Sequence, residues 1–285
     1  MSIKNNEILT WEETIVLLRK SRANTQWIRA AYLEDDLSEN CSRYSKSNEF
    51  NLIKEIIYEY KRDKSIKILD VAAGNGISTI SFGLLGYSVD AIEPDPSETV
   101  GRGAINSMAK KYNLSNINVI DSYGENTNLN SEAYDVVFIR QGLHHADDIK
   151  LMLKEFNRLL KRDGLLLSIR DHVVDNYGES LERFLDSQID HQYYKGENAY
   201  TLKDYIAFIK EAGFMVKKVL TPYSNQINLN LSDEEILKKI MQSTVGKWIT
   251  MLFGKKISLL LNQYHNSRKK IPGRLYSFVA IKEDK

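Results

Sequence analysis

The stretch that decides the fold is Ile66-Lys-Ile-Leu-Asp-Val-Ala-Ala-Gly-Asn-Gly-Ile-Ser-Thr79. Its first six residues form a short apolar run with β-branched side chains, which is typical of a buried parallel strand. Gly74 and Gly76 then let the backbone turn sharply and approach a bound molecule, because glycine has no Cβ. Ser78 and Thr79 begin a segment whose N–H groups suit an anionic group. The stretch therefore predicts a strand, a glycine turn and a helix at a ligand site, although an ordinary tight turn also uses two glycines.

A second run, Tyr87-Ser-Val-Asp-Ala-Ile92, predicts the next strand and delivers Glu93 at its end. An acid at the tip of the second strand accepts hydrogen bonds from the hydroxyls of an adenosine ribose in nucleotide-binding α/β folds. We therefore interpret Glu93 as a cofactor ligand, the alternative being a solvated acid at the end of a strand.

The signatures of other adenosine cofactors are missing. A phosphate loop needs Gly-Lys-Ser or Gly-Lys-Thr, and the sequence has neither. The dinucleotide fingerprint needs Gly or Ala three residues after Gly76, where Thr79 stands. The segment Asp70-Val-Ala-Ala-Gly-Asn-Gly76 instead resembles the first motif of the class I S-adenosylmethionine-dependent methyltransferases. That motif is Asp, an aliphatic residue, Gly, a small residue, Gly, any residue and Gly, and this chain departs from it at Ala72.

The resemblance implies both a fold and a cofactor. The fold is α/β, with a Rossmann-like seven-stranded sheet that is mostly parallel, an antiparallel C-terminal strand, N-terminal helices and a helical insertion. The cofactor is S-adenosyl-L-methionine, and its product is S-adenosyl-L-homocysteine. The predicted cofactor-binding residues are Tyr44, Asp70, Ala72, Gly74, Asn75, Gly76, Glu93, Pro94, Tyr123, Gly124 and Arg140.

The apolar runs also define the predicted domains. The capping box Thr10-Trp-Glu-Glu13 starts a helical segment over residues 1–60 that we expect to cover the cofactor site. Residues 61–224 and 274–285 form the predicted methyltransferase core. The last two strands are separated by too many residues for a hairpin loop, so residues 225–273 are interpreted as a helical insertion that caps the site or joins two subunits.

Two tyrosines are placed by comparison with the family. Tyr44 lies in a stretch that resembles the segment before the first strand, where an aromatic ring covers the methionine part of the cofactor, but it equally suits packing between helices. After the third strand the family usually has Gly-Asp, and this chain has Asp121-Ser-Tyr-Gly-Glu125. Tyr123 could stack on the adenine while Gly124 exposes a backbone donor.

Two polar clusters follow the fourth and fifth predicted strands, Arg140-Gln-Gly-Leu-His-His-Ala-Asp-Asp148 and Arg170-Asp-His172. The carboxyl ends of parallel strands face the ligand in this class of fold. The predicted catalytic residues are His144, His145 and Asp171, with a histidine as base and either Asp171 or Asp148 to orient it. In many members of the family one such histidine only hydrogen-bonds the loop. No metal site is predicted, because neighbouring histidines diverge and no distant Cys or His spacing completes a tetrahedron.

The segment Asp190-His-Gln-Tyr-Tyr-Lys-Gly-Glu-Asn-Ala-Tyr200 is rich in side chains that hydrogen-bond and stack on polar rings. We interpret it as a substrate loop that folds over the site, the alternative being a surface connector. The predicted substrate-binding residues are Gln141, Arg170, His172, His191, Tyr193, Tyr194, Asn198 and Tyr200.

Composition narrows the class of protein. The chain has 285 residues, is 42% hydrophobic and 27% charged, and carries a net charge of +1, so a broad nucleic-acid footprint is not expected. The single cysteine cannot form an internal disulfide, and the polar N-terminus lacks the apolar core of a signal peptide. No run approaches a membrane span. We therefore expect a cytoplasmic protein with a small-molecule substrate, which could form a homodimer through the helical insertion.

Three functions fit the sequence. The first is O-methylation of a small polar acceptor, such as a sugar-like or natural-product molecule, for which a base is needed because a hydroxyl is a poor nucleophile. The second is N- or C-methylation of a small molecule or a quinone-like lipid. The third is a non-catalytic scaffold that binds the cofactor.

Overall fold

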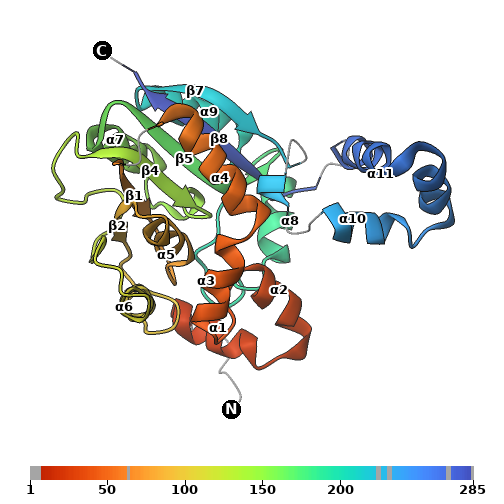
Figure 1. Cartoon of the computed structure of the whole chain (residues 1–285), viewed down its shortest axis with the longest axis horizontal. Coiled ribbons are helices and arrows are strands. Elements are labelled where there is room, and N and C mark those ends of the chain that lie inside the picture. The colour runs from red at the N-terminus through yellow and green to blue at the C-terminus, as the bar shows by residue number, and fades with distance from the viewer. Residues whose placement is uncertain (1–7, 63–64, 223–225, 230–232, 268–270, 284–285) are drawn as a thin grey trace.

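The computed structural model describes residues 8–62, 65–222, 226–229, 233–267 and 271–283. Its centre is a twisted sheet with the main strand order β3-β2-β1-β4-β5-β8-β7 (Figure 1). The strands are β1 Lys67–Val71, β2 Ser88–Ile92, β3 Ile117–Ile120, β4 Tyr134–Arg140, β5 Leu160–Val174, β6 Tyr200–Thr201, β7 Phe214–Leu220 and β8 Arg274–Lys282. β8 runs antiparallel to both of its neighbours, β5 and β7. The predicted Rossmann-like fold, mostly parallel with an antiparallel C-terminal strand, is confirmed.

The two-residue strand β6 was not predicted. It pairs with the far end of β5, where Val173 lies opposite Tyr200. β5 reaches this far because an irregularity between Ser168 and Asp171 lets it bend and continue, with Arg170 at φ 65°. Tyr200, predicted to touch the substrate, therefore belongs to the sheet.

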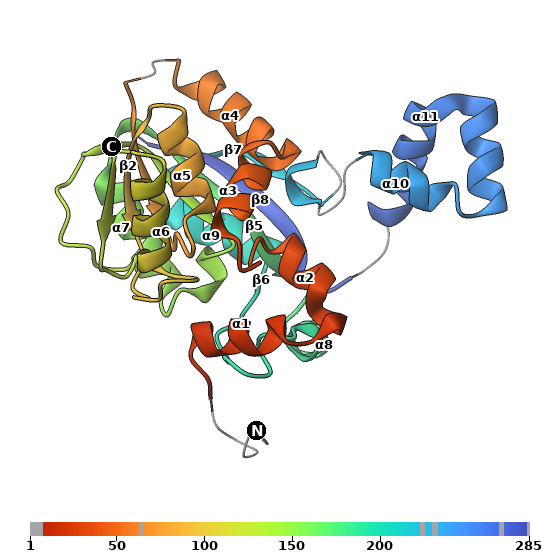
Figure 2. The same ribbon diagram turned by 60° about the horizontal axis from the view of Figure 1, so that its bottom comes forward.

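Helices cover both faces of the sheet (Figures 1 and 2). In β4, Val136 and Phe138 pack on the side of α4 (Asn48–Tyr60) and α5 (Ile77–Leu84). Val137 and Ile139 pack on the other side, with α7 (Ile149–Leu159) and α9 (Leu202–Glu211). This alternation follows from the two-residue period of a strand and explains why β4 reads as a continuous apolar run. The helices of the two layers and the remaining core helices are α3 Leu37–Ser45, α4 Asn48–Tyr60, α5 Ile77–Leu84, α6 Arg102–Lys111, α7 Ile149–Leu159, α8 Glu179–Ser187 and α9 Leu202–Glu211.

The N-terminal helices α1 (Trp11–Arg19) and α2 (Thr25–Ala30) lie across the carboxyl edge of the sheet (Figure 2). α1 begins with the predicted capping box: Thr10 accepts a hydrogen bond from the N–H of Glu13, and the Glu13 carboxylate accepts one from the N–H of Thr10. The sequence signal for this helix start is therefore confirmed.

The helices α10 (Asp233–Ile240) and α11 (Thr244–Ser267) project from the sheet domain as an arm (Figures 1 and 2). They lie in the predicted helical insertion. Gly254, at φ 82° and ψ 166°, interrupts α11 and divides it into two helical halves. The short 3₁₀ turn η3 (Gln226–Asn228) precedes the arm, and its Ile227 is fully buried in the core cluster beside α4. Residues just inside the predicted insertion thus pack with the core, and the domain boundary stays a prediction.

The turn between β1 and α5 is held from inside the protein. The buried carboxylate of Asp70 accepts hydrogen bonds from Ser78 Oγ and Thr79 Oγ1, both at 2.6 Å. Ala72, at φ 53°, occupies a left-handed conformation at the position where the family motif has its first glycine. Gly76 caps α5 at φ 81°, a conformation that glycine adopts without strain.

Replacement of Gly76 by alanine should destabilise the fold more than the same change at Gly86. Both glycines have left-handed φ values, of 81° and 87°, so each substitution costs about 1–2 kcal/mol in backbone strain. A Cβ at Gly76 would lie only 2.8 Å from Cγ1 of Ile105, whereas nothing lies within 4 Å of one at Gly86. Overpacking should therefore add about 1–3 kcal/mol at Gly76 alone. Urea unfolding of both variants measures the difference, and equal losses would show that Ile105 adjusts without cost.

Candidate functional site

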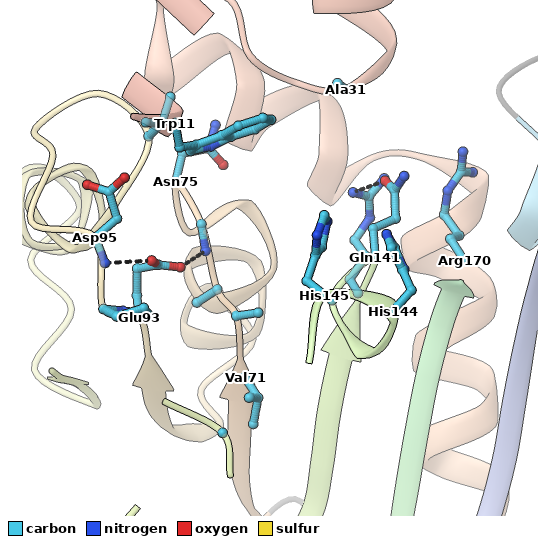
Figure 3. Close-up of a pocket in the computed structure, with 18 of the residues that line it drawn as sticks. Trp11, Ala31, Val71, Asn75, Glu93, Asp95, Gln141, His144, His145 and Arg170 are labelled. Atoms are coloured by element: carbon cyan, nitrogen blue, oxygen red, sulfur yellow. Dashed lines mark hydrogen bonds between the residues drawn. The ribbon is translucent and has the colours of Figure 1, made fainter. Parts of the chain in front are cut away.

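A cavity of about 620 Å³ opens at the carboxyl edge of the parallel strands (Figure 3). The residues that follow β1, β2, β4 and β5 form one side, and the segment of α1 and α2, including Trp11 and Ala31, forms the other. Parallel strands all end at this edge, which explains why segments far apart in the sequence meet here. The predicted site residues that line the cavity are Ala72, Gly74, Asn75, Glu93, Pro94, Tyr123, Gly124, Arg140, Gln141, His144, His145, Arg170, His172 and Tyr194.

Some predicted cofactor residues lie behind the cavity wall. Tyr44 is fully buried, with its ring 5.3 Å from that of Phe50 and the Arg140 guanidinium 5.4 Å from its centroid. The alternative interpretation, packing between helices, therefore describes Tyr44. Asp70 and Gly76 do not line the cavity either, and they shape the turn that presents Gly74 and Asn75. We correct their predicted role from direct contact to positioning.

The predicted substrate loop contributes less than expected. Tyr194 lines the cavity, but His191, Tyr193, Asn198 and Tyr200 do not. The amide of Asn198 points to the hydroxyl of Tyr200 at 3.4 Å, and the Tyr200 ring packs on those of Tyr205 and Phe208. These side chains fix the loop on the sheet, so we correct their assignment as direct substrate contacts.

Several residues of the cavity wall were not predicted. Trp11, Trp27 and Leu33 come from the N-terminal segment, which contains no ligand-binding motif. Asp190 and Glu197 come from the predicted substrate loop. The predicted substrate loop therefore borders the cavity through Asp190, Tyr194 and Glu197, and its role in substrate binding stays a prediction.

Glu93 connects the turns that follow β1 and β2 at the cofactor end of the cavity (Figure 3). Its Oε2 accepts from the N–H of Gly74 at 2.6 Å, and its Oε1 accepts from the N–H of Asp95 at 2.9 Å. Burial raises the pKa of Glu93 to about 7, against the effect of these two donors. Each carboxylate oxygen has two acceptor directions, so the ionised side chain can also accept from ribose hydroxyls.

A charged trio forms the base of the cavity between β4 and β5. Glu49, from α4, accepts from Arg140 Nε at 2.6 Å and lies 3.3 Å from Nη1 of Arg170. Burial by itself would raise the pKa of Glu49, but the two guanidinium groups hold it below its usual value. Arg140 also donates to Oε1 of Gln141 at 2.8 Å, which orients that amide at the cavity wall.

Asp171 ties the loop after β4 to the bend in β5. Its Oδ1 accepts from the N–H groups of Leu143 and His144, at 3.1 and 3.3 Å, and contacts Nδ1 of His144 at 2.9 Å. Its Oδ2 accepts from the hydroxyl of Ser168. Asp171 is fully buried and does not line the cavity. The predicted pairing of an aspartate with a histidine therefore exists, and it directs Nε2 of His144 away from Asp171.

Three histidines gather beside this carboxylate. His144 lies in the 3₁₀ turn η2 (Leu143–His145), and its ring centroid is 4.3 Å from that of His145 and 4.9 Å from that of His172. The Nδ1 atoms of His145 and His172 contact the carbonyl oxygens of Gly196 and Gly273, both at 2.7 Å. A carbonyl only accepts, so each Nδ1 carries the proton and leaves Nε2 as the acceptor.

Glu197 faces this group from the loop. Its Oε2 is 3.6 Å from Nε2 of His144, and its Oε1 is 3.5 Å from Nε2 of His145. Burial and the neighbouring Asp190 raise the pKa of Glu197 to about 9. Burial lowers the pKa of His172 to about 3 and that of His144 well below its usual value. The three imidazoles are therefore neutral near pH 7, with lone pairs available for a proton or a metal.

The comparisons with known proteins agree with the motif. Residues 69–168 match the family model of the methyltransferase domain. The chain carries a class I S-adenosylmethionine-dependent methyltransferase domain. The turn is open at Gly74, because the nearest atom to the position of a Cβ there is a carbonyl oxygen 3.9 Å away. The Glu93 carboxylate lies beside this turn and accepts hydrogen bonds. The combination fits an adenosine cofactor.

Curated relatives match this methyltransferase domain in sequence. The uncharacterized methyltransferase YcgJ of Bacillus subtilis is 26% identical over 125 residues, which are 42% of this chain and 48% of that protein. The ubiquinone/menaquinone biosynthesis C-methyltransferase UbiE of Rhizobium rhizogenes is 30% identical over 118 residues, 40% of this chain and 45% of that protein. The match spans about half the length of these relatives.

Solved structures share the methyltransferase fold. A candidate sarcosine dimethylglycine methyltransferase of Galdieria sulphuraria has a TM-score of 0.57 at 16% identity, covering 83% of this chain and 85% of that chain. The geranyl diphosphate C-methyltransferase of Streptomyces coelicolor, crystallised with Mg²⁺, geranyl diphosphate and S-adenosylhomocysteine, has a TM-score of 0.56 at 11% identity, covering 82% and 79%. At these identities the likeness establishes the fold.

Cofactor affinity should fall as the pH drops through about 7. Protonation of Glu93, whose pKa burial raises to about 7, removes an acceptor for the ribose hydroxyls. We expect S-adenosylmethionine to bind roughly tenfold more weakly at pH 6 than at pH 8, the factor that corresponds to one pKa unit. Calorimetry at both pH values measures the change. Glu93→Gln should bind more weakly and lose this pH dependence; an unchanged slope in Glu93→Gln would assign the effect to another group.

Proposed function

We propose that the protein transfers the methyl group of S-adenosylmethionine to a hydroxyl of a small acceptor bound at the ends of β4 and β5. The observation that carries the proposal is that one cavity is lined by both the cofactor turn and the histidine group. When bound, the cofactor supplies an electrophilic methyl group on a sulfonium. The protein then has to hold the acceptor close and aligned, which can supply most of the catalysis.

His145 is the better candidate for the base. Its side chain is 35% exposed, whereas that of His144 is 1% exposed. The Gly196 carbonyl fixes the tautomer of His145, so its Nε2 can take the proton of an acceptor hydroxyl. The imidazolium formed in this way would lie 3.5 Å from Oε1 of Glu197, and its positive charge would favour ionisation of that carboxyl.

A carbon or nitrogen acceptor is the second candidate. The curated relative UbiE is a C-methyltransferase of quinone biosynthesis, and the fold neighbour from Streptomyces methylates geranyl diphosphate at carbon. Trp11, Trp27 and Leu33 give the cavity wall an apolar part that suits a quinone-like or prenyl group. The scaffold alternative has less support, because the cavity places ionisable side chains beside the cofactor turn.

The test is an acceptor screen with a labelled methyl donor, run on hydroxyl, amine and quinone-like compounds. With a hydroxyl acceptor, His145→Ala and His145→Asn should both lower kcat by roughly 10²-fold, the usual contribution of a general base. Asparagine can still donate to the Gly196 carbonyl, so it separates loss of the base from loss of the loop contact. Cofactor affinity should change little in both variants.

Three results would overturn parts of this proposal. Wild-type turnover of both His145 variants across the titration range of histidine would leave proximity as the source of catalysis. Exclusive methylation of carbon or nitrogen acceptors would select the second candidate. Cofactor binding without methylation of any acceptor class would select the scaffold.

A further inference from the structure

We propose that His144, His172 and Glu197 bind a divalent transition-metal ion in the acceptor part of the cavity. This inference rests on the proposed function for its role, but the site itself is defined by the side chains. One ring nitrogen of each histidine and a carboxylate oxygen lie within 4.8 Å of one another. Two imidazoles and one carboxylate are a ligand set of zinc and of non-haem iron sites.

The three ligand atoms would have to approach one another to bind a common ion, since they lie up to 4.8 Å apart. Metal bonds to histidine nitrogen and carboxylate oxygen are about 2.0–2.2 Å, so two ligands at a tetrahedral angle lie roughly 3.4 Å apart. His144 Nε2 and Glu197 Oε2 are 3.6 Å apart. Glu197 Oε2 is also buried without a hydrogen-bond partner among the described residues, and its side chain is 8% exposed. A cation would supply a partner for this oxygen.

The groups behind the ligands have the arrangement found around metal sites. Nδ1 of His144 is held by Asp171, and Nδ1 of His172 is held by the carbonyl of Gly273. Such contacts fix the ring orientation and leave Nε2 as the ligand atom.

Divergence of neighbouring histidines is the reason that the sequence alone predicts no metal site. His144 and His145 do diverge, since one is tied to Asp171 and the other to Gly196. The second nitrogen ligand comes instead from His172 at the end of β5, and the carboxylate comes from the loop. The ion would hold an acceptor oxygen and lower its pKa. His145 Nε2 then takes the hydroxyl proton, the oxygen–methyl bond forms, and the sulfur–methyl bond breaks.

Metal content tests this site without any acceptor. The full chain is treated with chelator, loaded with Zn²⁺ or Co²⁺, dialysed and analysed for bound ion. We expect one ion per chain and, for Co²⁺, visible absorption of a nitrogen-ligated ion. His172→Ala and Glu197→Gln should each weaken binding by at least about tenfold, as should Asp171→Asn through the ring of His144.

His265→Ala, which alters an exposed histidine of α11, is the matched control and should keep the ion. Absence of a bound ion, or equal content in wild type and in His172→Ala and Glu197→Gln, would overturn the site. Since cofactor binding and the acceptor screen are measured separately, a failed metal test leaves the methyltransferase proposal intact.

A second inference rests on the arm of α10 and α11, where we propose an anionic lipid bilayer surface as the partner. The arm exposes large apolar side chains that the sheet domain does not cover, with exposed fractions of 56% for Trp248, 69% for Met251, 65% for Leu252 and 58% for Phe253. This apolar run ends at the break in α11 at Gly254 and is followed by Lys255 and Lys256. Contiguous exposed patches of this kind mark interaction sites.

The charge of the arm favours an anionic lipid surface as its partner. The sequence from residue 236 to residue 282 contains no aspartate or glutamate. Its basic residues within α10 and α11 are Lys238, Lys239, Lys247, Lys255 and Lys256. α10 begins with Asp233, Glu234 and Glu235, so the part of the arm without acids is α11. Apolar side chains with lysines and without acids, as in α11, are the composition of segments that lie in the interface of anionic membranes. Contact between the α11 helices of two copies would bring surfaces of the same sign together, which disfavours a homodimer through α11. Among the described helices, none is long and apolar enough to cross a membrane.

Sedimentation with vesicles tests the surface. The full chain should bind vesicles that contain phosphatidylglycerol at least roughly tenfold more strongly than vesicles of phosphatidylcholine alone. Combined replacement of Trp248, Leu252 and Phe253 by serine should weaken this binding by a similar factor. Tyr58→Ser, which removes an aromatic side chain of α4 that is 67% exposed, is the control. Equal binding to both vesicles, or a dimer that the triple variant dissociates, would overturn the proposal.

Discussion

Parallel strands end at the same edge of a sheet, and this constraint organises the whole site. The strands β1, β2, β4 and β5 run parallel, so the turns that follow them are neighbours whatever their separation in sequence. The chain leaves or bends the sheet through left-handed residues at Ala72, Gln141 and Arg170. Such conformations cluster at functional sites, because the surrounding packing has to maintain them. The cofactor turn, the charged trio and the histidine group are therefore products of one topology.

The sequence predicted well what depends on local pattern. Strands buried on both faces read as apolar runs, and the capping residue Thr10 begins a helix in the structure. Residues directly after a strand, such as Gly74, Glu93 and Gln141, were placed correctly at the cavity. The positions of Tyr44 and Glu197 were not predicted. Tyr44 is buried and Glu197 faces the cavity because of how segments distant in the sequence pack together. No periodicity in a single sequence contains that information.

The adjacent histidines His144 and His145 have different tertiary contacts and therefore different roles. In the turn η2 the two rings are tilted by 39° and have different partners, Asp171 for His144 and the Gly196 carbonyl for His145. Their Nε2 atoms face different oxygens of Glu197. Nε2 of His144 can therefore bind a cation while Nε2 of His145 remains a base. The sequence alone does not distinguish these two roles, because the histidines are adjacent and of the same type.

The net charge of +1 conceals a strong separation of charge. Residues 236–282 contain ten basic residues and no acid, which leaves 29 basic and 38 acidic residues in the rest of the chain. The rest, which includes Asp233, Glu234 and Glu235 at the start of α10, is thus net negative, while residues 236–282 are positive. An anionic surface would attract the arm and repel the remainder, so the field itself would orient the protein with its arm toward the membrane. Because the apolar residues that would enter the interface lie on that same arm, electrostatic attraction and apolar burial act on the same part of the molecule.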